Sequence, residues 1–146
     1  MSIRLSDAVR GVRAGLIATA AMSAALGLAH RIGTIDRQPP QIIVDALVPE
    51  EPEPRKRRLA ALAHFGYGTS AAVAFAVTLP RATWGITSGT MYGAMVWLAG
   101  YEGWLPMMGI LPPAHRDDRG RVGTMVAAHL VFGAALGFVL RRRARD

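Results

Sequence analysis

Two histidines lie inside apolar stretches of the sequence, where polar side chains are rare. His64 stands in "LAHFGYGTSAAVAF" and His129 in "AAHLVFGAALGFVL". Each is followed by two residues, an aromatic residue, glycine, three residues and a small residue. Imidazole binds metals and haem iron, and it exchanges protons near neutral pH. Because polar rings are costly in hydrocarbon, both residues are candidates for function.

The spacing of these histidines also predicts a structural role. His64 precedes Gly68 by four residues, and His129 precedes Gly133 by four. Residues four apart share one face of a helix, so both rings are expected to face neighbouring helices. An interhelical hydrogen bond is the simplest use of such a ring. The residues expected at similar depth form a candidate polar layer for binding or proton handling: His64, His129, Glu102, Tyr101 and His30.

Three interpretations of this layer stay open at the level of sequence. The first is structural. The second is a small proton- or solute-conducting carrier that uses the His and Glu side chains. The third is a binder of b-type haem or of a metal through His64 and His129, with Glu102 as a further metal ligand. The first needs no cofactor and no metal, and it is the one we adopt.

Composition and motifs argue against catalysis. The chain has no cysteine, which excludes disulfides, thiol catalysis and cysteine-based metal sites. A phosphate-binding loop, a nucleophile elbow and an HExxH motif are also missing from the sequence. We therefore expect a non-enzymatic protein with no catalytic residues.

Four apolar runs must position the histidines. A helix needs roughly 17–25 apolar residues to cross a bilayer. A soluble bundle of 146 residues has too little interior to bury four such helices. The sequence predicts an all-α integral membrane bundle forming a single domain, with transmembrane helices at about 11–32, 57–79, 84–102 and 121–141.

Small residues recur at every fourth position of these runs. Lipid tails are as apolar as leucine, so membrane helices associate by close backbone packing instead of hydrophobic burial. GxxxG-like spacing on every run predicts a tight bundle. The glycines expected to pack the helices are Gly85, Gly89, Gly93, Gly68, Gly133 and Gly137.

Two connections are apolar but interrupted. In residues 33–56, the pair Pro39-Pro40 opens a short helix expected to lie on the membrane interface. Residues 103–113 are broken by proline and glycine and are predicted to be an interfacial loop. Four aromatic residues are expected to act as interfacial anchors: Trp84, Trp97, Tyr101 and Trp104.

The basic residues cluster at the ends of the apolar runs. The chain has 17 Lys and Arg against 10 Asp and Glu. Clusters at 55–58 and 141–145 flank apolar segments, which indicates contact with anionic lipid headgroups and argues against a nucleic-acid partner. No acid lies among the arginines 141–145, which favours cytoplasmic termini.

Residues 11 to 143 resemble the YagU-type family of bacterial inner-membrane proteins, a domain of unknown function. The resemblance is carried, in order, by "GLIATAAMSAAL", "AHFGYGTSAAVAF", "WGITSGTMYGAM", "LPMMGILPP" and "AHLVFGAALGFVLRRR". It implies a multi-pass protein of the bacterial cytoplasmic membrane and no known reaction. We expect a structural or accessory role, alone, as a homo-oligomer or with another membrane protein.

Overall fold

The computed structural model describes residues 5–143, which form helices and loops and no strand. Three long helices dominate the fold: α1 (Leu5–Arg31), α3 (Glu53–Thr78) and α6 (Arg119–Arg143). A fourth helix is composite, with α4 (Ile86–Trp97), a π-helical segment η2 (Leu98–Trp104) and α5 (Leu105–Met107) following one another without a loop. The short elements are α2 (Pro39–Leu47) and the 3₁₀ turns η1 (Arg81–Thr83) and η3 (Ala114–Arg116).

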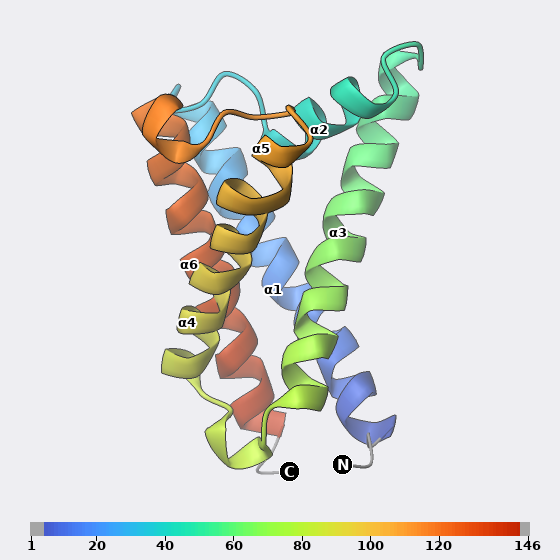
Figure 1. Ribbon diagram of the computed structural model, residues 1–146. Coiled ribbons are helices and arrows are strands. Elements are labelled where there is room, and N and C mark those ends of the chain that lie inside the picture. Colours follow the sequence, from blue (N-terminus) through green and yellow to red (C-terminus); the bar gives the residue numbers. More distant parts are fainter. Residues whose placement is uncertain (1–4, 144–146) are drawn as a thin grey trace.

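The three long helices α1, α3 and α6 are each long and apolar enough to cross a membrane. α1 packs along both α3 and α6, and α6 packs along α4. The first turn of α1 and the last turn of α6 lie at one end of the bundle, together with η1 (Figure 1). We call this the η1 end. The opposite end, the α2 end, carries α2, α5 and η3 (Figure 1).

The core follows the helical repeat of the apolar residues. On α1, Ala14, Ala18, Met22 and Leu26 are buried at intervals of four residues, which places them on one face. They pack in one cluster with buried residues of the other long helices, including Phe75, Phe132, Leu136 and Leu140. The small residues on α1 bring it close to its neighbours.

α4 and α6 approach each other until their backbones touch. A Cβ built on Gly89 would lie 2.8 Å from the backbone nitrogen of Gly137 and closer still to the carbonyl oxygen of Gly133. On the facing helix, a Cβ on Gly137 would lie 2.6 Å from the carbonyl carbon of Gly85. A Cβ on Gly93 would lie 3.1 Å from the Cα of Gly133. These helices therefore have no room for a side chain at their contact.

A second close approach joins α1 to α3 and was not singled out in the sequence. A Cβ on Gly11 would lie 2.8 Å from the Cα of Val73, and one on Gly15 would lie 2.8 Å from the Cα of Thr69. Gly11 and Gly15 have GxxxG spacing, but they precede the apolar centre of the run. A search for small-residue spacing in the apolar centre of the run therefore misses this pair of glycines.

Residues 103–107 are helical, where the sequence predicted a loop. Leu105 N–H donates to the carbonyl oxygen of Gly100, five residues earlier, as in a π-helix. The helix continues through Pro106 and ends at Met107. Proline has no N–H to donate, so the helix lacks one backbone hydrogen bond at Pro106. This position follows directly after the wider π turn, where the regular bonding pattern already changes. The sequence predicts a break at proline and glycine, whereas the structure shows a change of helical pitch there.

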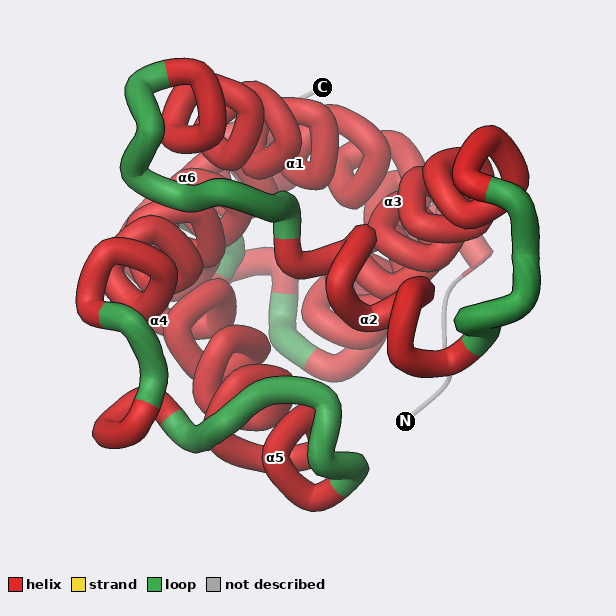
Figure 2. Tube along the Cα trace, turned by 90° about the horizontal axis from the view of Figure 1, so that it is seen from above, coloured by secondary structure: helices red, strands yellow, loops and turns green. Residues whose placement is uncertain are grey.

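The short helix after Pro39-Pro40 is present as α2, and its apolar residues face the bundle. Pro39 and Val44 are buried, while Ile42 and Ile43 pack against the core. α2 contacts α3. Seen from above, α2 lies at the end of the bundle, between α3 and α5 (Figure 2). This helix closes part of the α2 end.

Candidate functional site

A cavity of about 350 Å³ lies at the α2 end of the bundle. Its wall is built by α1, α2, α3, the composite helix and α6. Most of the wall is apolar or aromatic, as in sites for small organic ligands. Wall residues include Met22, Ile43, Tyr67, Trp104, Met125 and Phe132.

Three of the five predicted layer residues come together in this wall: His64 from α3, Tyr101 from η2 and His129 from α6. His129 is 8% exposed and Tyr101 is 1% exposed. The two histidines, 65 positions apart in the chain, are thus gathered around one space. These three residues of the predicted layer form part of the cavity wall.

His129 is held in one orientation by its own helix. Its Nδ1 lies 2.8 Å from the carbonyl oxygen of Met125, one turn earlier. A carbonyl oxygen only accepts, so the proton of the neutral ring sits on Nδ1 and Nε2 is an acceptor. Within residues 5–143 no group hydrogen-bonds this Nε2. This nitrogen can accept a hydrogen bond from a donor placed in the cavity.

His64 has a buried ring nitrogen without a partner. Its Nε2 makes no hydrogen bond to any described residue and is shielded from solvent. The ring meets Phe65 edge to face, with centroids 6.0 Å apart. An unsatisfied buried polar atom destabilises a fold by about 1–3 kcal/mol. Protein atoms cover this nitrogen, so it does not open onto the cavity itself.

The hydroxyl of Tyr101 is directed away from this role. It donates to Oδ2 of Asp117, whose side chain is only 5% exposed. The other oxygen of Asp117 accepts from Arg121 Nη1 at 3.0 Å and from the backbone N–H of Asp118 at 2.7 Å. This network ties η2 to the first turn of α6 and fixes the Tyr101 ring in the wall.

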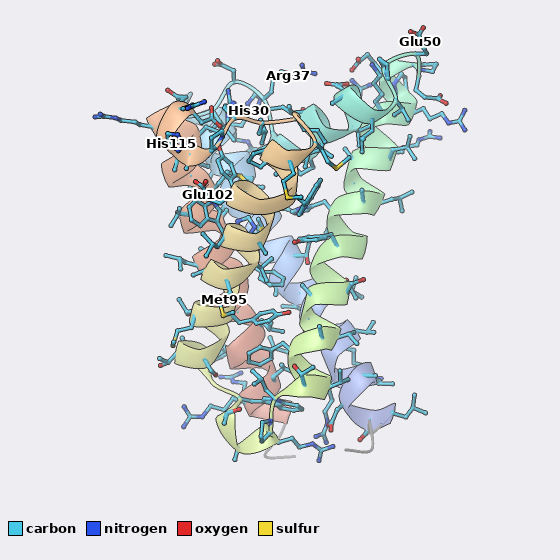
Figure 3. The ribbon with its side chains drawn as sticks, in the orientation of Figure 1. His30, Arg37, Glu50, Met95, Glu102 and His115 are labelled. Atoms are coloured by element: carbon cyan, nitrogen blue, oxygen red, sulfur yellow. The ribbon has the colours of Figure 1, made fainter. Side chains whose placement is uncertain are left out.

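The remaining layer residues, Glu102 and His30, support loops at the same end. Glu102 Oε1 accepts from the backbone N–H of Ala114 at 2.8 Å, and His30 Nδ1 lies 3.1 Å from the carbonyl oxygen of Ile35. Figure 3 shows both side chains near His115 at the α2 end. Neither lines the cavity. Among the residues that the structure describes, no three His, Asp or Glu side chains gather as metal ligands.

The rim of the cavity lies between α3 and the composite helix. Ala63 and Tyr67 on α3 and Leu47 on α2 line the cavity and are also exposed. The rings of Tyr67 and Trp104 meet at the rim, with centroids 6.4 Å apart and planes tilted by 56°. Gly100 lies beside them, and a Cβ there would be 3.8 Å from the hydroxyl of Tyr67.

Sequence reasoning missed Tyr67 and Trp104 as wall residues. Trp104 is one of the expected interfacial anchors, and it also lines the cavity. Two other expected anchors, Trp84 and Tyr101, are 4% and 1% exposed and pack in the core. The aromatic residues one turn from each histidine were the available signal.

The comparison with family models covers nearly the whole chain. The model described as a family of unknown function, DUF6789, matches residues 5–146. The chain belongs to this family. No curated protein matches it, and no solved structure does either. The matched region includes every element that builds the cavity, and the family's description assigns no activity.

Proposed function

We propose that this DUF6789 protein is a non-enzymatic, accessory membrane protein that holds an apolar, membrane-dissolved molecule in the cavity at its α2 end. The observation that carries the proposal is the wall itself. It encloses about 350 Å³, mostly with apolar and aromatic side chains. A volume in this range suits a small organic ligand.

The proposal places the protein across the bacterial cytoplasmic membrane with four spans. Three long apolar helices support it. At about 1.5 Å per residue, the composite helix from Ile86 to Met107 is long enough to form the fourth span. The resemblance to YagU-type proteins supports the bacterial inner membrane. The arginines at the end of α6 favour cytoplasmic termini, and the start of α1 lies at the same end (Figure 1).

An apolar ligand suits this wall better than the conduction of a proton or ion. Charge transfer across a membrane needs a continuous series of polar groups or waters. Here Glu102, the acid of the predicted layer, is bonded to a loop N–H instead of lining the cavity. The rim also opens beside Tyr67 and Ala63, which lie on the exposed face of α3. A guest dissolved in lipid tails enters through such a side opening.

A cavity-filling variant tests the proposal. Gly100→Leu adds a side chain at a wall position where a Cβ meets no heavy atom closer than 3.6 Å. The variant is expected to fold, since leucine also favours helix over glycine. The matched control is Gly66→Leu on α3, where a Cβ has open space. Both are compared with the parent protein in lipid nanodiscs.

The measurement is saturable quenching of tryptophan fluorescence by 4-bromotoluene, because Trp104 lies in the cavity wall. We expect the parent and Gly66→Leu to show a saturable component that Gly100→Leu loses. Quenching that rises linearly and equally in all three proteins would reflect partition into lipid alone. That outcome would remove the proposed function.

A further inference from the structure

We propose that the molecule held in the cavity carries an aromatic hydroxyl, as in a phenol or hydroquinone ring with an apolar tail, and that this hydroxyl donates to Nε2 of His129. The inference rests on the proposed function and adds the chemical class of the ligand. It follows from which hydrogen-bonding positions in the wall are occupied and which are open.

The open acceptor is Nε2 of His129. Because Nδ1 is bonded to the carbonyl oxygen of Met125 at 2.8 Å, the neutral ring has its proton there. Nε2 then accepts and cannot donate. A ligand that fills the cavity with hydrocarbon alone, or with a ketone or ether oxygen, brings no proton to this nitrogen. A hydroxyl does.

Nε2 of His64 does not compete for this hydroxyl, because protein atoms cover it. It is buried, and no described group bonds to it. Its tautomer is not constrained by a carbonyl, so this nitrogen can donate or accept. The hydroxyl of the ligand is therefore matched to His129, whose open nitrogen accepts.

The third polar group of the wall does not compete for the ligand. The hydroxyl of Tyr101 is already used by Asp117, and its ring presents carbon atoms to the cavity. With Tyr67, Trp104 and Phe132 it gives the wall several flat rings. Aromatic rings attract another ring through edge-to-face and offset contacts. This composition favours a flat aromatic ligand over a branched aliphatic alcohol.

The size of the cavity suits a ring, and its rim suits a tail. About 350 Å³ lies at the lower end of volumes found for ligand sites, roughly 300–1,000 Å³. A longer apolar chain must leave the cavity. Leu47 and Ala63 form an apolar, exposed part of the rim, where such a chain passes into the lipid.

The test compares 4-bromophenol with 4-bromoanisole, which differ in the hydroxyl proton and one methyl group. Each quenches the tryptophan fluorescence of the protein in nanodiscs. The ratio of their half-saturating concentrations is measured for the parent and for His129→Phe, so that partition into lipid cancels. One hydrogen bond predicts about a fivefold preference for the phenol, present in the parent and lost in His129→Phe. 4-Bromocyclohexanol, as the aliphatic alcohol, is expected to bind more weakly than the phenol.

His129→Gln provides a second variant if His129→Phe does not fold, because its amide oxygen retains an acceptor. We expect it to keep part of the preference. Equal binding of phenol and anisole in the parent, with both abolished by Gly100→Leu, would overturn this inference and leave the proposed function standing. Absence of saturable quenching by either probe would overturn both. A haem absorption band in the purified protein would show that the histidines hold iron, and would overturn the inference.

Discussion

The two ends of the bundle use different kinds of residue, with opposite effects on the space between the helices. At the η1 end, Gly89 and Gly137 bring α4 and α6 into backbone contact, and Gly11 and Gly15 do the same for α1 and α3. At the α2 end, α3 and the composite helix are held apart around a cavity of about 350 Å³. One end is closed by the absence of side chains, and the other is left open by their size.

The residues at the contact decide the difference. Between α3 and α4, the hydroxyl of Tyr92 donates to the carbonyl oxygen of Ala71 at 2.8 Å, and its ring packs edge to face on Phe75 at 5.0 Å. An aromatic side chain thus sets the spacing of these two helices. Toward the α2 end, Tyr67 and Trp104 meet only at the rim. Glycine contacts bring helices together, and aromatic side chains hold α3 and α4 apart.

The largest expected effect breaks the closed end. Gly89→Leu forces a Cβ to within 2.8 Å of the backbone nitrogen of Gly137, so α4 and α6 must separate. Overpacking of this kind destabilises by about 3 kcal/mol. We expect a clear fall in the melting temperature of the detergent-solubilised protein, followed by tryptophan fluorescence.

Two controls accompany this substitution. Gly123→Leu makes the same change on α6 where a Cβ has open space, and Leu98→Ala removes an exposed side chain from η2. Both are expected to melt near the parent temperature. A Gly89→Leu protein that melts with them would show that the α4–α6 contact does not hold the bundle together.

A smaller effect concerns the clasp between α1 and η1 at the closed end. Arg81 Nε donates to Oδ1 of Asp7 at 2.7 Å, and Arg81 Nη2 donates to the hydroxyl of Ser6 at 3.0 Å. Asp7 is 13% exposed and Arg81 is 35% exposed, so solvent screens part of the interaction. Asp7→Asn is expected to reduce stability by about 1–2 kcal/mol.

Asp36→Asn is the matched control, because Asp36 is exposed at the other end of α1. Thermal melts of the three proteins are compared at one pH and salt concentration. Equal losses in Asp7→Asn and Asp36→Asn would mean that the clasp adds nothing specific to the closed end.

The smallest effect sharpens the description of the open end. Tyr101→Phe removes the bond to Asp117 but leaves that carboxylate its bonds to Arg121 and to the Asp118 N–H. We expect a loss of about 1 kcal/mol in stability. The half-saturating concentration of 4-bromophenol is expected to stay within about twofold, because the lost hydroxyl does not serve the ligand.

Tyr67→Phe provides the comparison, since this tyrosine is 46% exposed at the rim. Its stability is expected to match the parent within error. If Tyr101→Phe abolished phenol binding without changing stability, its hydroxyl would belong to the ligand site, and the division of polar groups in the wall would need to be redrawn.

Much of the helical framework was predictable from the sequence. Each apolar run forms a helix because unpaired backbone groups are costly in apolar surroundings and helices pair them internally. The run expected at 121–141 lies within α6, and the run expected at 57–79 lies within α3 except for Leu79, which caps that helix. The shared frame of His64 and His129 predicted that both rings face other helices, and both line the cavity. These features depend on local periodicity, which the sequence contains directly.

Only the tertiary structure decided how the polar residues divide their work. Glu102 and Tyr101 are neighbours in the chain, yet Glu102 bonds a loop N–H and Tyr101 bonds Asp117. The π turn rotates this segment, and no periodic rule anticipates a single wider turn. α2 turns its apolar face to the bundle because a cavity there offers surface to bury. Helix and apolar face are local properties of the sequence, whereas a cavity exists only once several helices have set their distances from one another.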